Sequence, residues 1–135
     1  MYKESQLTGK IIGHAMDVHR KLGPGFKEAI YHTALFQVLA KNGFDVESEK
    51  EFDVYFDNDI IGNFRIDLYI ENKIIVELKA VSGEIPILFK TQVVSYLKAS
   101  NKEVGLLINF GNTSLDIKRF GNYKNYSKNS VQSNL

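Results

Sequence analysis

Apolar residues recur with helical spacing in two stretches near the start of the chain. Between Leu7 and Leu22 they come every three or four residues, and Gly23-Pro24-Gly25 follows directly. A second apolar stripe runs from Phe26 to Lys41 and is followed by Asn42-Gly43. A period near 3.6 that ends in glycine-rich sequence predicts two amphipathic helices. We expect the two helices to pack against each other as a hairpin.

Apolar and polar residues alternate through the middle of the chain, which is the period of a β-strand. One alternating run covers Glu49 to Phe56, and the turn residues Asp57-Asn58-Asp59 separate it from a second run that ends at Ile70. A third run, Ile74 to Lys79, follows Glu71-Asn72-Lys73. Short connections of this kind join antiparallel strands, so we predict a meander of three strands.

The last third of the chain predicts one more helix and a buried strand. Pro86 suits the first turn of a helix that runs to about Ala99, and Glu103 to Phe110 is apolar enough to be buried on both faces. A strand reached through a crossover helix lies parallel to its predecessor. Ser114 to Phe120 predicts a short edge strand or turn. The expected fold is therefore α/β, with a mixed sheet and the element order ααβββαβ.

Composition adds few constraints. The chain has 135 residues, a formal net charge of +1 and no cysteine. This length buries about 65 to 70% of the unfolded surface, so we predict one domain over residues 1–120 with a polar, loosely ordered tail at 121–135. The lack of cysteine excludes disulfides and thiolate metal sites. With no apolar run of membrane-spanning length, a cytoplasmic protein is expected.

The pairing register of the predicted hairpin around Glu71-Asn72-Lys73 is fixed, because the apolar residues of both strands must lie on the same face of the sheet. The expected pairs are Ile70 with Ile74, Leu68 with Val76, and Ile66 with Leu78. On the opposite face this register places Asp67 across from Glu77 and Arg65 across from Lys79. Like charges in directly opposed positions destabilise a sheet.

Three arrangements would relieve the repulsion between Asp67 and Glu77. A cation binds both carboxylates, one carboxyl keeps a proton, or a bulge separates the two. A functionally silent alternative also exists, in which the acids form surface ion pairs with Arg65 and Lys79. Such exposed pairs contribute only ~0 to 1 kcal/mol.

Several blocks of the sequence resemble the bacterial GxxExxY protein family, which belongs to the PD-(D/E)xK nuclease superfamily. Gly25, Glu28 and Tyr31 occupy the positions that name the family, within Val18-His-Arg-Lys-Leu-Gly-Pro-Gly-Phe-Lys-Glu-Ala-Ile-Tyr31. The later blocks that are similar to the family are Glu77-Leu-Lys-Ala-Val81, Gln92, Gly105-Leu-Leu-Ile-Asn-Phe110 and Ile117-Lys-Arg119. The resemblance covers about Leu7 to Phe120 and implies a restriction-endonuclease-like core.

The resemblance also implies a phosphodiesterase that cleaves DNA or RNA with Mg²⁺ or Mn²⁺. Asp67, Glu77 and Glu28 would be the metal ligands, since Mg²⁺ takes oxygen donors. Lys79 would orient a water or neutralise charge on the phosphate, and Gln92 would be a hydrogen-bonding partner from the crossover helix.

Plainer interpretations of the same residues remain open. Glu28 near a helix N-terminus is favourable by ~0.3 to 1 kcal/mol through the helix dipole alone, and Gln92 fits the edge of an apolar stripe. His32, like His14, is interpreted as a helix-surface residue. Tyr31 is interpreted as a packing residue with its hydroxyl near the site rather than as a nucleophile.

The neutral charge supports an alternative function for the whole chain. A nonspecific nucleic-acid binder usually shows a basic surplus, whereas the net charge here is +1. The alternative is a catalytically silent module that keeps the nuclease fold and binds nucleic acid or assembles with protein. Association of two copies as a homodimer is an option that the sequence leaves open.

Overall fold

A computed structural model describes residues 3–122 and 131–134 of the chain. These residues form three helices and six strands. In chain order the elements are α1 (Ser5–Leu22), α2 (Glu28–Lys41), β1 (Val46–Phe56), β2 (Asp59–Ile70), β3 (Ile74–Lys79), α3 (Ile87–Ser100), β4 (Val104–Asn109), β5 (Asp116–Asn122) and β6 (Val131–Asn134).

The strands form one sheet in which the spatial order follows the chain order, β1 to β6. Only β3 and β4 are parallel, and α3 makes the crossover between them. The other neighbouring strands are antiparallel. The predicted α/β fold is therefore confirmed, with the order ααβββαβ, and the expected short final strand is β5.

The C-terminal region differs from the predicted tail. Gly121 and Asn122 belong to β5, where Gly121 pairs with Val104 of β4. Val131–Asn134 form β6, which pairs with β5 at the edge of the sheet. The sequence of β6 shows no apolar alternation that predicts a strand. An edge strand can form without such alternation, because it needs only backbone pairing on one side. Residues 123–130 and 135 lie outside the described part of the chain.

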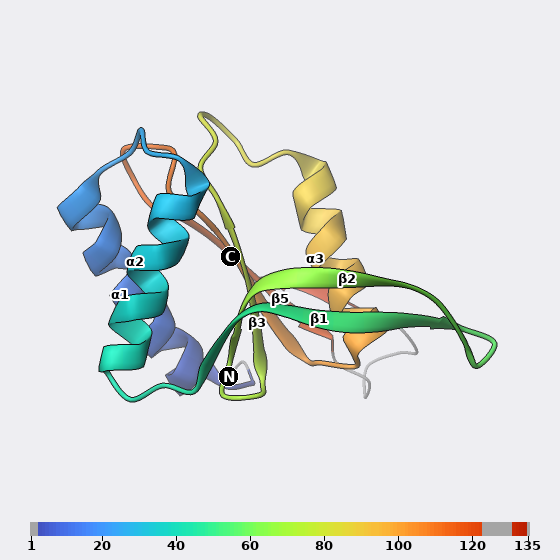
Figure 1. Ribbon diagram of the computed structural model, residues 1–135. Coiled ribbons are helices and arrows are strands. Elements are labelled where there is room, and N and C mark those ends of the chain that lie inside the picture. The colour runs from blue at the N-terminus through green and yellow to red at the C-terminus, as the bar shows by residue number, and fades with distance from the viewer. Residues whose placement is uncertain (1–2, 123–130, 135) are drawn as a thin grey trace.

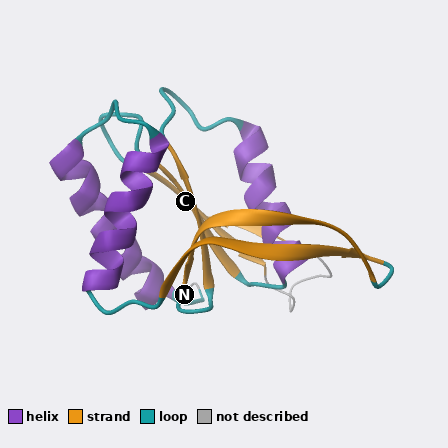
Figure 2. Cartoon of the chain, in the orientation of Figure 1, coloured by secondary structure: helices purple, strands orange, loops and turns teal. Residues whose placement is uncertain are grey.

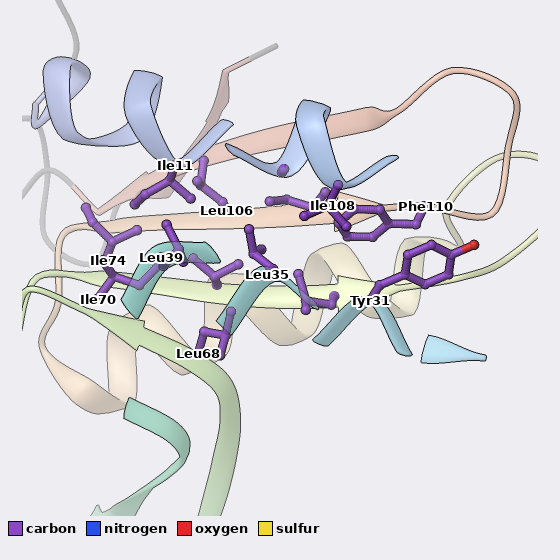
Figure 3. Packing of buried hydrophobic residues seen from close by; sticks show 14 of the residues in the cluster. Ile11, Tyr31, Leu35, Leu39, Leu68, Ile70, Ile74, Leu106, Ile108 and Phe110 are labelled. Atoms are coloured by element: carbon purple, nitrogen blue, oxygen red, sulfur yellow. The ribbon is translucent and has the colours of Figure 1, made fainter. Parts of the chain in front are cut away.

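Helices cover both faces of the sheet (Figures 1 and 2). On one face, α1 and α2 pack as the predicted hairpin over a core that contains Ile11, Leu35, Leu68, Val76 and Ile108. Figure 3 shows side chains from the helices meeting side chains from the central strands in this core. On the other face, α3 covers a smaller core. Its buried members are Ile66, Tyr69, Ile75, Ile85, Val93, Leu97, Leu107 and Phe120.

Two element boundaries matter for the site. Helix α2 begins at Glu28, two residues later than predicted, because Gly25 has a φ of 110° and Lys27 is extended. Strands β1 and β2 form a long hairpin that projects beyond the helices (Figure 1). At its tip, Asp57 and Asn58 both have positive φ, as a two-residue primed turn requires.

Candidate functional site

The hairpin of β2 and β3 opens at Asp67 and Glu77. Its closed end has the predicted register, with Leu68 paired with Val76 and Ile70 with Ile74. Beyond Leu68 the backbone hydrogen bonds between β2 and β3 stop, and side-chain hydrogen bonds take their place. The Asp67 N–H donates to Glu77 Oε2 at 2.7 Å, and the Leu78 N–H donates to Asp67 Oδ2 at 2.7 Å. The two acids therefore face each other across the gap, each held by the backbone of the opposite strand.

Two of the predicted cross-strand relationships are wrong beyond this point. Ile66 lies in the core under α3, whereas Leu78 lies in the core under α1 and α2, so the two do not pair. Arg65 lies 3.8 Å from Glu51 on β1 instead of opposing Lys79. The physical reason is that the carboxylates occupy backbone N–H groups of the two strands, so the ladder stops and β2 turns toward the other face.

Electrostatics at the opening favour a proton or a cation. Glu77 is only 7% exposed, and burial, followed by the charge of Asp67, raises its pKa to about 8. Burial also raises the pKa of Asp67, against the opposing effect of its hydrogen bond from Leu78. Two ionised carboxylates at this spacing repel each other, so a bound cation would replace the proton that Glu77 otherwise retains near neutral pH.

Lys79 is the last residue of β3 and follows Glu77 by two residues, so both lie on the same face of the strand. Its Nζ is 4.1 Å from the centroid of the Phe89 ring on α3, which is cation–π distance. The Lys79 charge lowers the pKa values of Asp67 and Glu77, although burial outweighs it in both. A positive charge is therefore held beside the acid pair.

Glu28 joins this group from the first turn of α2. The residue is exposed, yet desolvation of its carboxyl is the largest cause of a raised pKa. The charge of Lys79 opposes that rise and the charge of Asp67 adds to it. The charges of Lys79 and Asp67 therefore act on Glu28. Its role as a third carboxylate, which the family resemblance implies, stays a prediction.

Gln92 lies on α3 and is half-buried. Among residues 3–122 and 131–134, none forms a hydrogen bond with its side chain, so its predicted role stays a prediction. Tyr96, one helical turn later, is a residue that the sequence analysis missed. Burial raises the pKa of Tyr96, and the charges of Glu77 and then Asp67 raise it further. Its ring stacks on Phe64 with centroids 4.4 Å apart, which fixes it beside the opening.

A second group of ligand atoms shares Asp67. His32, Glu49 and Asp67 each offer an atom within 4.8 Å of the others. The His32 side chain is only 17% exposed, and its Nδ1 lies 3.8 Å from Glu49 Oε1. The interpretation of His32 as a surface residue is therefore corrected. One spacing in the sequence could have indicated this group, because His32 follows Glu28 by four residues and so lies on the same side of α2. Glu49 lies between Ser48 and Lys50, which pair with Leu68 and Ile66 on either side of Asp67.

The donor set suits a hard divalent cation. Carboxylate oxygens are the ligands that Mg²⁺ and Mn²⁺ accept, and an imidazole adds affinity for transition metals over Mg²⁺. Glu77 is buried with a second acid beside it, which is an arrangement that a cation stabilises. Asp67 belongs to both groups and is the residue that would be shared.

Comparison with known proteins identifies the family. No curated protein matches this sequence. The structure titled "Crystal structure of SSO0001" is similar at a TM-score of 0.55 and 25% identity, over 67% of this chain and 48% of that one, so the similarity spans about half of that chain. None of the described helices has the length and hydropathy needed to span a membrane. A family model described as the PD-(D/E)XK nuclease superfamily matches residues 5–120, and the chain therefore belongs to this superfamily.

Proposed function

We propose that this protein is a divalent-metal-dependent nuclease that hydrolyses phosphodiester bonds of DNA or RNA. The observation that carries the proposal is the open end of the β2–β3 hairpin, where Asp67 and Glu77 face each other through two 2.7 Å bonds to backbone N–H groups. Membership of the nuclease superfamily supports a phosphodiester substrate.

Each polar group of the opening has a proposed role. Asp67 and Glu77 would hold Mg²⁺ or Mn²⁺, with Glu28 as a third carboxylate, and a bound cation would supply an acidified water and charge neutralisation at the phosphate. Lys79, beside Phe89, balances negative charge that develops on the phosphate oxygens. Gln92 contacts the substrate or its water from α3.

We further propose that the chain is a member of the GxxExxY branch of the superfamily. Gly25, Glu28 and Tyr31 have the spacing that names this family. Support comes from the place of Glu28 as the first residue of α2, from which its carboxyl interacts with Lys79 and Asp67.

A cleavage assay tests the proposed function. Purified protein is incubated with single- and double-stranded DNA and RNA in Mg²⁺ or Mn²⁺, and EDTA should abolish cleavage. Asp67→Ala and Lys79→Ala should each reduce the rate by about 10²-fold or more, as loss of a charge-stabilising group does. Asp53→Ala, which removes an exposed acid of β1, is the matched control and should cleave normally. Cleavage that survives in Asp67→Ala rules out the proposed site.

One observation favours a second candidate, a silent assembly module. The tip of the β1–β2 hairpin exposes 60–64% of Tyr55, Phe56, Ile60 and Ile61. Exposed apolar clusters of this kind mark contact surfaces for protein. If the protein binds no Mn²⁺ and cleaves nothing, but self-associates through the tip so that Phe56→Ser makes it monomeric, the assembly role replaces the enzymatic one.

A further inference from the structure

The hydroxyl group of Tyr31 closes the loop between α1 and α2. It donates a hydrogen bond to the Gly23 carbonyl at 2.6 Å and accepts one from the Phe26 N–H at 3.1 Å. Tyr31 is fully buried although its hydroxyl is polar. Both bonds go to backbone atoms of the loop that leads into Glu28, so the hydroxyl fixes the shape of that loop.

The Tyr31 ring connects this loop to the end of β3. It stacks on Phe110 with centroids 4.7 Å apart and an interplanar angle of 12°, and Figure 3 shows the two rings together at the end of the core. The Phe110 N–H donates to the Lys79 carbonyl at 2.8 Å. A continuous set of contacts therefore runs from the α1–α2 loop through Tyr31 and Phe110 to Lys79.

Asparagine side chains hold the loop that follows Lys79. Asn109, fully buried, accepts from the Val81 N–H and donates to the Val81 carbonyl, both at 2.9 Å. Asn112 makes the same pair of bonds with Gly83, each at 2.8 Å. The loop that follows β3 is therefore fixed to the end of β4 and to the residues just after it. Tyr31 links the α1–α2 loop to the same point.

The start of α2 needs such an anchor. Its N-cap position, Lys27, makes no side-chain capping bond, so the first N–H groups of the helix lack the usual stabilisation. An uncapped first turn frays. Glu28 lies in that turn, and Tyr31 is three residues later on the same side of the helix.

We propose that Tyr31 is a positioning residue, whose hydroxyl fixes Glu28 relative to Lys79 and the acids of the opening. The inference rests on the proposed function, in which Glu28 is the third carboxylate. It also accounts for the spacing of the family signature. Gly25 adopts a φ of 110°, which favours glycine, Glu28 starts the helix, and Tyr31 returns to the loop one turn later.

Tyr31→Phe tests the inference because it keeps the ring and removes both hydrogen bonds. The Mn²⁺ dissociation constant from calorimetry and the Mg²⁺ midpoint of cleavage should both rise about 10-fold. In a Glu28→Gln background the same substitution should add little, since Tyr31 acts through Glu28. Equal, additive effects in the two backgrounds would instead assign Tyr31 a purely structural role.

Matched variants separate positioning from general destabilisation. Tyr69→Phe removes another buried hydroxyl, which donates to the Asn72 carbonyl at 2.8 Å at the closed end of the hairpin. This variant should leave both the Mn²⁺ dissociation constant and the Mg²⁺ midpoint of cleavage unchanged. Gly25→Ala strains the loop directly and should shift the midpoints in the same direction as Tyr31→Phe. Gly43→Ala, at a φ of 83° after α2, is its control. If Tyr31→Phe does not fold, the Gly25→Ala and Gly43→Ala pair decides the question.

Hydrogen exchange distinguishes failure of this inference from failure of the proposed function. Amides of residues 26–31 should exchange faster in Tyr31→Phe, whether or not the protein binds metal. Faster exchange in a protein that neither binds Mn²⁺ nor cleaves would refute the nuclease and leave the anchoring of α2 intact. Normal metal dependence and unchanged exchange in Tyr31→Phe, in a protein that cleaves, would overturn the positioning role alone.

Discussion

The two ends of the β2–β3 hairpin have the same alternating sequence pattern but different structures. At the closed end, Leu68 pairs with Val76 through the backbone. At the open end, the Asp67 and Glu77 side chains take the N–H groups instead. The comparison shows that hydrophobic alternation determines register only where no side chain competes for the backbone. The open end lacks backbone ladder bonds and instead holds one buried acid, Glu77, beside one half-buried acid, Asp67.

The closed end should carry more of the folding free energy. Leu68 is fully buried between the sheet and the helices, so Leu68→Ala should lower the free energy of unfolding by about 2 to 5 kcal/mol in a urea titration. Ile60→Ala, on the exposed hairpin tip, is the control and should change it by less than about 0.5 kcal/mol. An equally small effect for Leu68→Ala would show that the closed end is not the anchor.

The open end should make stability depend on pH. The folded pKa of Glu77, about 8, lies above its ordinary value of 4.5, so the folded state binds the proton more tightly than the unfolded state. Its contribution to stability is fully present below about pH 4.5 and is lost as pH rises through 8, by at most ~1.4 kcal/mol per pH unit. Urea titrations in EDTA between pH 5 and 9 measure this slope.

Glu77→Gln should flatten that dependence, because the amide does not ionise. Above pH 8 the variant should be more stable than the wild type, and Mg²⁺ should raise the melting temperature of the wild type only. A steep loss of stability that persists in Glu77→Gln would place the titrating group elsewhere.

The second ligand group should affect the choice of metal more than the stability. His32→Asn removes the imidazole beside Asp67 and Glu49, so the preference for Mn²⁺ over Mg²⁺ in cleavage should fall several-fold. His14→Asn is a suitable control, because His14 contacts the Phe44 ring at 5.7 Å and belongs to neither ligand group. An unchanged metal preference would remove His32 from the site.

Gln92→Ala should have the smallest effect on folding. Its amide makes no hydrogen bond with any residue in 3–122 or 131–134, so the melting temperature should stay nearly constant. Loss of cleavage without loss of stability would support its predicted contact with substrate. Normal cleavage would identify Gln92 as a residue at the edge of the apolar stripe of α3.

The sequence predicted the parts of the structure that depend on local periodicity. The helical hairpin, the meander and the crossover to β4 all follow from spacing and turn residues. Register at the closed end also followed, because a one-residue slip would expose Leu68 and Val76. The opposition of Asp67 and Glu77 was a consequence of that register.

Other features depend on contacts between distant elements, and the hydrophobic pattern alone did not predict them. Ile66 changes face because side chains terminate the ladder, which alternation alone does not encode. Glu49 and Tyr96 approach Asp67 only after the long hairpin and α3 have packed. His32 looked like a surface residue because its helix stripe does not show that α2 begins over the open end of the hairpin.

Proton release on Mn²⁺ binding tests the central claim most directly. Calorimetric titrations at pH 7 in two buffers with different ionisation enthalpies measure the number of protons released for each bound ion. Because Glu77 keeps a proton at this pH, the wild type should release about one proton per Mn²⁺, and Glu77→Gln should release almost none. Absence of binding, or binding to the wild type without proton release, would contradict the account of the open hairpin as a metal site.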